Sequence, residues 1–326
     1  MFRYLHRFYL ILVLFTPVNS FAESEKNWGQ GPIELVDQYF FSTLHLSSRP
    51  ITTEVLQVGE SSLRLSGAWT NIAALKEEAY SIDVETHTGT LDWRIGVFEN
   101  FEFGLRLPLM WRGGGDHDSD INSVHKHLGV TDGTRGRFRS DGFQIQGSNR
   151  DDSEFDFDEQ GTELGNVVLE SKYLITEGDK ENPAIVFNTA LSLPTAADSY
   201  GHESVDLLAG VTISKRWGNI IGYAGSSILF YNHPTVNGVN YKPIHPEAFT
   251  ELEYEWNEDF SILIGLLGHA GGKAEIENHP DYSIYLDTGI KYRVSDHIGA
   301  ELLFRENTIP SSGSADVSVL AGIVID

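Results

Sequence analysis

Apolar and polar residues alternate along most of this chain, and the alternation is strictest from Leu91 to Trp111. Apolar side chains occupy every second position from Leu91 to Val97 and again from Phe101 to Leu109, and Glu99-Asn100 separates the two runs. A period of two predicts β-strands with one apolar and one polar face. The stretch is therefore expected to form a β-hairpin.

The same pattern continues to the end of the chain and predicts twelve strands. Their approximate ranges are 61–71, 79–97, 101–111, 165–175, 184–194, 205–216, 220–231, 247–256, 260–270, 282–294, 298–306 and 316–325. Short polar turns alternate with longer connections, and no amphipathic helices lie between the strands to cover their apolar faces. Lipid is the expected cover, because strands of about 10 residues suit a tilted membrane crossing. The predicted fold is an all-β transmembrane antiparallel β-barrel with short periplasmic turns and longer extracellular loops.

Composition divides the 326 residues into three parts. Residues 1–22 carry two arginines, an apolar core and a small-x-small cleavage site, which is typical of a secretory signal peptide. We expect 23–60 to be a periplasmic N-terminal segment that folds into or under the barrel, or a partly ordered leader, and 61–326 to be the barrel. The absence of cysteine suits an exported protein.

The charge balance of the mature chain is strongly acidic. Removal of the signal peptide lowers the Lys+Arg count from 23 to 21 against 47 Asp+Glu, a net charge of −26. Such an excess argues against a nucleic-acid partner. It suits a surface in contact with outer-membrane lipids and lipopolysaccharide through divalent cations, and it serves loop solubility equally well.

Charged residues on the polar faces are expected to line the interior of the barrel. For the second strand this requires a register change near residues 88–90. The lumen-lining candidates are Asp83, Glu85, Arg94, Arg106, Glu251, Glu253, Glu255 and Arg293. Opposed acidic and basic walls would orient polar solutes at a constriction of a pore. In the alternative reading, the acids and bases pair with each other in a closed lumen.

The 112–164 connection is far longer than an ordinary loop and is the predicted gate. Residues 120–129 are expected to form a short helix that packs into the barrel mouth as a constriction or plug. The constriction candidates are Asp120, His125 and Arg135. Asp116-x-Asp118-x-Asp120 resembles the start of a calcium loop, but Ile121 stands where glycine is needed. We therefore expect no metal and no cofactor.

One pair of residues has the spacing of a hydrolase site. His202-x-Ser204 matches the His and Ser of outer-membrane lipid hydrolases, two positions apart on one strand face. The apolar positions of this strand place the pair on the lumen side, away from lipid. An ordinary turn into a strand explains the spacing equally well, and no catalytic residue is assigned.

A set of short motifs resembles a known family. They are Asp83-x-Glu85, Pro108, Gly113-Gly114, Asp120-Ile121 before His125, Leu128-Gly129, Arg135, Leu164-Gly165 before Lys172, Leu193-Pro194-Thr195 and Ser204-x-Asp206. From Gly31-Pro32 to the C-terminus the chain resembles the domain of unknown function 3187 family of Gram-negative outer-membrane proteins. It departs from that pattern at Ala196, where glycine is expected, and at His202-Glu203. The resemblance implies an outer-membrane β-barrel of uncharacterised role and supplies no catalytic residues.

These observations favour a non-enzymatic outer-membrane barrel that acts as a narrow or gated pore for small solutes, with loop 112–164 as the gate. A closed barrel that serves as a structural or surface-interaction module is the second reading. A lipid-modifying hydrolase is the third.

Overall fold

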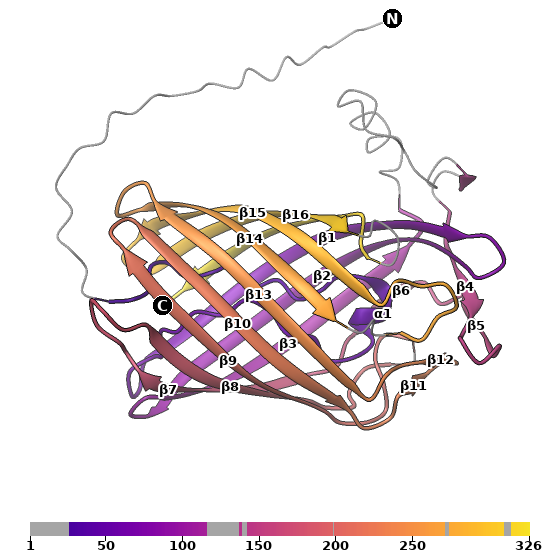
Figure 1. Ribbon diagram of the computed structural model, residues 1–326, viewed down its shortest axis with the longest axis horizontal. Helices are drawn as coiled ribbons and strands as arrows, with labels where there is room; N and C mark the ends of the chain where they lie inside the picture. The colour runs from indigo at the N-terminus through magenta and orange to yellow at the C-terminus, as the bar shows by residue number, and fades with distance from the viewer. Residues whose placement is uncertain (1–25, 116–136, 139–141, 198, 271–273, 310–313) are drawn as a thin grey trace, which may run out of the picture.

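The computed structural model describes residues 26–115, 137–138, 142–197, 199–270, 274–309 and 314–326. Within them, twelve antiparallel strands form a closed barrel (Figure 1), which confirms the predicted fold. Closure occurs where β1 pairs with β17. The barrel strands are β1 (Ser61–Lys76), β2 (Tyr80–Phe98), β3 (Phe101–Gly113), β7 (Val168–Thr176), β8 (Ala184–Ser192), β9 (Asp206–Trp217), β10 (Ile220–Tyr231), β13 (Ile244–Glu255), β14 (Phe260–Ala270), β15 (Tyr282–Ser295), β16 (Ile298–Ile309) and β17 (Val317–Ile325).

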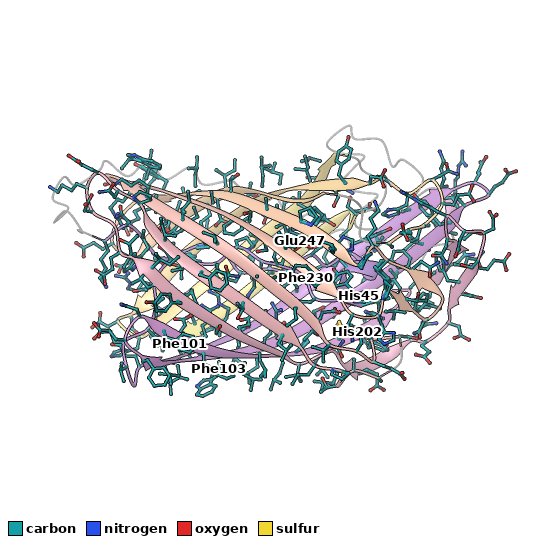
Figure 2. The ribbon with its side chains drawn as sticks, turned by 60° about the horizontal axis from the view of Figure 1, so that its bottom comes forward. His45, Phe101, Phe103, His202, Phe230 and Glu247 are labelled. Atoms are coloured by element: carbon teal, nitrogen blue, oxygen red, sulfur yellow. The ribbon has the colours of Figure 1, made fainter. Side chains whose placement is uncertain are left out.

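The barrel wall is apolar outside and charged inside. Along β13, exposed Leu252 and Tyr254 alternate with buried Glu251 and Glu253. Phe101 and Phe103 lie near the end that carries the short turns, whereas His45 and His202 lie toward the other end (Figure 2). We call these the short-turn end and the long-loop end. No α-helix in the described part of the chain has the length and hydropathy needed to cross a bilayer.

Residues 26–60, which we call the luminal segment, run through the interior of the barrel. The segment enters at the short-turn end, reaches the long-loop end at the helical turn α1 (Phe40–Thr43), and returns to the start of β1 (Figure 1). It contributes Ile33, Phe40, Phe41 and Leu44 to the buried interior. The barrel is therefore filled along its length by a stretch that precedes its first strand.

Additional short elements cover the long-loop end. They are β4 (Gln144–Ser148), β5 (Glu154–Phe157), β6 (Gly161–Leu164), β11 (Thr235–Val236) and β12 (Val239–Asn240). β4 extends the sheet beside β2, and β5 pairs with β4. Phe155 and Phe157 of β5 pack edge-on against Phe41 and Phe40 of α1, respectively. An apolar cluster thus joins the luminal segment to the described part of loop 112–164.

The structure corrects the expected register of β2. Its pairing with β1 runs without a shift from Ser61↔Ile95 to Lys76↔Tyr80, so no register change occurs near residues 88–90. Because alternate residues point to opposite faces, Asp83 and Glu85 share the outer face with Trp93. They are not lumen-lining. They are buried on the outer side, where Gly115 approaches Glu85.

Two sequence predictions lie outside the described residues. These are the signal peptide over 1–22 and the short helix over 120–129, which carries Asp120 and His125. Arg135 also falls there.

Candidate functional site

The glutamates of β13 bind the backbone of the luminal segment. Glu253 accepts hydrogen bonds from the backbone N–H groups of Gln30 (2.9 Å) and Gly31 (3.1 Å). Glu251 accepts one from Ile33 at 3.3 Å. An irregular backbone inside a barrel cannot leave its N–H groups unpaired without a large penalty. The carboxylates of the wall therefore take the place of a neighbouring strand.

A buried ion network fixes the segment near the short-turn end of the lumen. Arg49 of the segment lies 2.9 Å from Asp92 of β2 and 2.7 Å from Glu170 of β7. Glu34, also of the segment, forms ion pairs with Arg94 of β2, with Arg49 itself (3.3 Å) and with Arg64 of β1 (3.6 Å). The segment has one limb before α1 and a returning limb after it. The first limb thus inserts Glu34, and the returning limb Arg49, between opposite charges of the wall.

Two other wall cations reinforce this arrangement. Lys172 pairs with Glu102 at 3.0 Å, and Glu102 also accepts a hydrogen bond from the backbone N–H of Leu56. Arg305 pairs with Asp287 at 2.7 Å and donates to the carbonyl oxygens of Leu35 and Val36. The polar wall therefore contacts the segment through both donors and acceptors, over both of its limbs.

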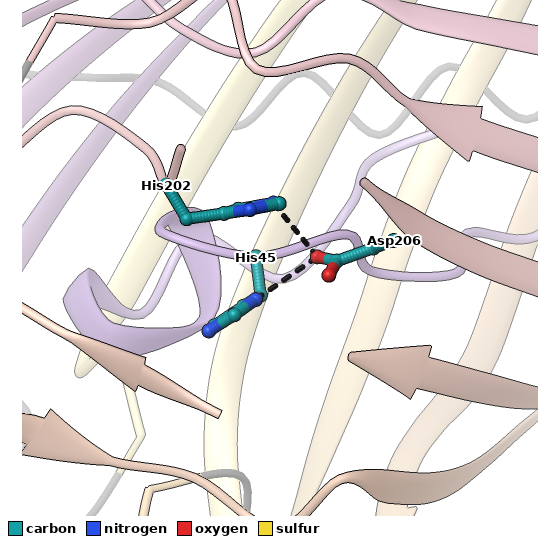
Figure 3. Close-up of side chains that lie close together, drawn as sticks. All are labelled: His45, His202 and Asp206. Carbon is teal, nitrogen blue, oxygen red and sulfur yellow. Dashed lines mark hydrogen bonds and ion pairs between the residues drawn. The ribbon is translucent and has the colours of Figure 1, made fainter. Parts of the chain in front are cut away.

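Near the long-loop end the segment meets a group of buried rings. Nδ1 of His45 lies 2.9 Å from Oδ2 of Asp206, and Nε2 of His202 lies 2.8 Å from the same oxygen (Figure 3). The guanidinium of Arg112 lies between the rings of Phe40 and Tyr200, about equally far from both (4.6 and 4.5 Å). These contacts hold α1 and the residues after it against the wall.

Loop contacts close the same end from outside. Arg150, next to β4, and Lys242, next to β12, both bond to Asp281 before β15. These hydrogen bonds hold the pKa of Asp281 below its usual range. Three connections that are far apart in sequence thus form a cap over the long-loop end.

The free space in the lumen is concentrated at the short-turn end. A vestibule of about 910 Å³ opens there, lined by charged residues of both signs, among them Arg64, Arg94, Glu102, Lys172 and Arg293. Beyond it, two small cavities between the segment and the wall measure about 50 and 20 Å³. Since one water needs roughly 10–15 Å³ of such space, these two cavities hold water but no larger solute.

The predicted lumen residues have different positions. Arg94, Arg106, Glu251 and Glu253 lie on the inner face and contact the segment or its ion network, with Arg106 placed 3.6 Å from Glu170. Glu255 pairs with Arg216 at the short-turn end, and Arg293 lies at the vestibule rim. The facing arginine and glutamate walls are separated by the luminal segment rather than by open space.

Sequence reasoning did not find the segment's own site residues, Glu34, Asp37, His45 and Arg49. Asp37 lies beside His269 of β14 and accepts a hydrogen bond from Tyr285 of β15. One signal was present in the sequence: 23–60 mixes large apolar residues with isolated charges. Isolated charges in such a segment need polar side chains from elsewhere in the protein as partners.

The family model described as "Protein of unknown function (DUF3187)" matches residues 8–325. The chain belongs to this family. A comparison with curated proteins gave no significant match.

Among solved structures, this DUF3187 protein is similar to the COG4313 outer membrane channel from Pseudomonas putida F1. The TM-score is 0.58 at 10% identity, over 84% of this chain and 97% of that chain. It also resembles the NanC porin with a TM-score of 0.45 at 9% identity, over 81% and 99% of the two chains. The first likeness establishes a shared barrel fold.

Proposed function

We propose that the protein is a gated passage for small solutes in the bacterial outer membrane, and that the luminal segment is the part that has to move. The apolar outer band of the barrel and its fold support the location. Lipids, and lipopolysaccharide on the outer side, are the expected neighbours of that band.

The way in which the luminal segment is held supports the proposal most strongly. It fills the lumen through side-chain contacts, and the barrel ladders close without it. The charged vestibule at one end leads directly to the Arg49 and Glu34 network. Displacing the segment would open a lumen lined by Arg94, Arg106, Glu251 and Glu253, with charges of both signs for polar solutes.

Conductance of the purified full-length protein in planar bilayers tests this. Arg49→Met keeps most of the side-chain volume, removes the guanidinium that pairs with Asp92, and leaves Glu34 and Glu170 paired with wall arginines alone. Breaking one partner of a buried ion pair costs about 3–5 kcal/mol. Because 1.4 kcal/mol is one factor of ten, the fraction of time spent open should rise about tenfold or more.

Arg137→Met is the matched control. Arg137 pairs with Glu77 on the surface, with both side chains more than half exposed, and such pairs contribute about 0–1 kcal/mol. This variant should conduct like the wild type. No current from any of the three proteins would refute the passage.

The closed-barrel reading has one observation in its favour. Phe40, Phe41 and Leu44 join Phe155 and Phe157 in an apolar cluster at the long-loop end, as a permanent seal would. Under that reading Arg49→Met would lower thermal stability and leave conductance at zero, so the same protein preparations separate the two functions.

We also propose that the protein is not an enzyme. Oγ of Ser204 lies 3.0 Å from Nδ1 of His202, but that nitrogen already accepts a hydrogen bond from the backbone N–H of Ser204. Both residues are buried inside the lumen, away from lipid. Lipase and deacylase assays of wild type and Ser204→Ala should give equal background rates, and a loss of activity in the variant would establish a hydrolase.

A further inference from the structure

Three buried side chains at the long-loop end have the composition of a metal site. His45 comes from the luminal segment, whereas His202 and Asp206 come from the barrel side, at the start of β9. One ligand atom from each lies within 4.8 Å of the others, and all three residues are buried (Figure 3).

Among the described residues, Nε2 of His202 and Oδ1 of Asp206 are buried and make no hydrogen bond. Oδ2 of Asp206 accepts from Nδ1 of His45 (2.9 Å) and from the backbone N–H of Leu46 (3.0 Å), which occupies its two lone pairs. Nε2 of His202 lies 2.8 Å from the same oxygen but is not aligned for a hydrogen bond. Oδ1 of Asp206 has no hydrogen-bond partner among the described residues. Buried polar atoms without partners are rare and call for an explanation.

We propose that His45, His202 and Asp206 bind a divalent transition-metal ion of the zinc type, which fastens the luminal segment to the barrel wall. Two imidazoles and one carboxylate suit zinc and its neighbours, whereas calcium and magnesium prefer oxygen ligands alone. Around zinc the ligand atoms lie roughly 3–3.5 Å apart, and the two stacked rings have to turn so that a nitrogen of each points at the same ion. Oδ1 of Asp206 or a water completes the coordination.

The surrounding residues already orient both imidazoles. His45 stacks on Tyr231 with ring centroids 4.1 Å apart and an interplanar angle of 11°, and on His202 at 4.6 Å. A metal on Nε2 of His202 requires the ring hydrogen on Nδ1, where Oγ of Ser204 accepts it in place of the present bond from the Ser204 backbone N–H. No proton is lost if both rings start neutral, because each ring hydrogen moves to the other nitrogen. Leu46 keeps its bond to Oδ2.

Co²⁺ and Zn²⁺ are the probes. The full-length protein, folded into detergent micelles with either ion and then dialysed, should retain one ion per chain. The Co²⁺ form should show the visible ligand-field absorption of a nitrogen and oxygen site. His45→Gln and Asp206→Asn should each weaken binding well beyond tenfold. Ser204→Ala should weaken it about 10–100-fold, the usual loss when a ligand histidine loses its hydrogen-bond partner.

His245→Gln is the matched control, because His245 is buried beside the same Tyr231 but bonds to the Lys242 carbonyl instead. It should bind like the wild type. Absence of stoichiometric ion and of the Co²⁺ spectrum in the wild type, or equal binding by His45→Gln, would overturn the site. The wild-type spectrum decides even if a variant fails to fold. Metal binding does not require the barrel to conduct, so failure of the passage and failure of the site remain separate results.

Discussion

A single glycine allows the luminal segment to rejoin the wall. Val58 pairs with Gly96 of β2, and Gly96 exchanges backbone hydrogen bonds with Gly59 and Glu60. A Cβ at residue 96 would lie within 2.6 Å of the carbonyl carbon of Gln57, which is backbone and cannot move aside. This close approach explains why residue 96 of an otherwise ordinary strand is glycine.

Gly96→Ala should therefore lower the free energy of unfolding by about 1–3 kcal/mol, the usual cost of overpacking. Thermal or urea unfolding in micelles measures it. Gly89→Ala in the same strand is the control, because the nearest atom to its Cβ is 3.9 Å away, and its change should stay within about 0.5 kcal/mol. Equal effects would mean that the segment does not approach β2 in this way.

The cap over the long-loop end contains a histidine that folds in its neutral form. Nδ1 of His279 donates to the carbonyl of Pro280 and Nε2 accepts from the Tyr39 hydroxyl, so the neutral ring is fully bonded. Burial lowers the pKa of His279 to about 4, and nearby Arg150 acts in the same direction, whereas Asp281 opposes it. Tyr80 packs against the same ring.

The pKa of a histidine in the unfolded chain is about 6.5. As the pH falls, His279 therefore takes up a proton in the unfolded chain before it does so in the folded protein. Its contribution to stability is complete above pH 6.5 and is lost as the pH falls from about 6.5 through 4. His279→Gln should flatten the dependence of the melting temperature on pH in that range. His297→Gln, exposed in a short turn, should keep the wild-type slope. Parallel curves for wild type and His279→Gln would contradict the assignment.

Residue identity alone predicted the inner charges of some strands and failed for others. Glu251 and Glu253 lie on the inner face, and the uninterrupted alternation of β13 is enough to predict which face that is. Asp83 and Glu85 lie on the outer face, contrary to the prediction, because the pairing of β2 with β1 has no register change. Asp83 and Glu85 are buried on the outer face, with Gly115 against Glu85, so their charge alone does not show which face of β2 they occupy.

At the scale of elements, the strands of the wall could be predicted from the sequence, whereas the path of the luminal segment and its contacts could not. The predicted strands agree with the observed ones to within a few residues at most ends, because a surface between lipid and water imposes period two. The luminal segment has no lipid-facing side and no ladder of its own. Its conformation is set by side chains such as Glu251, Asp92 and Asp206, which lie far away in sequence and whose convergence only the folded barrel reveals.

A disulfide tests the path of the segment's returning limb. The hydroxyl oxygens of Thr53 and Ser214 lie 2.5 Å apart, and the chain has no cysteine of its own. Thr53→Cys with Ser214→Cys should oxidise spontaneously during export, because the periplasm is oxidising and the side chains meet within the reach of a disulfide. Non-reducing electrophoresis and thiol labelling measure it.

The control pair combines Thr53→Cys with Ser283→Cys. Ser283 lies on β15, four strands from Ser214 around the barrel. This pair should remain reduced. Disulfide formation in both pairs, or in neither, would show that residue 53 does not occupy a fixed place against β9.

At the scale of the whole molecule, backbone pairing and lumen filling are separable. Each barrel strand pairs with its two neighbours in the wall, and within the described residues the luminal segment bridges to a barrel strand at Val58 and Gly96 alone. If the segment is absent, water can hydrate the charged side chains of the wall that now contact it. The barrel should therefore fold without its contents, at reduced stability.

Deletion of residues 27–54 from the mature protein tests this. The variant should still insert into micelles and show β-structure by circular dichroism, but it should melt at a lower temperature, since Asp92, Arg94 and Asp206 lose their buried partners. In bilayers it should conduct continuously, because water replaces the segment along the whole lumen. Failure to fold under conditions that fold Arg137→Met would identify the segment as a structural core. That result would favour the closed barrel over the gated passage.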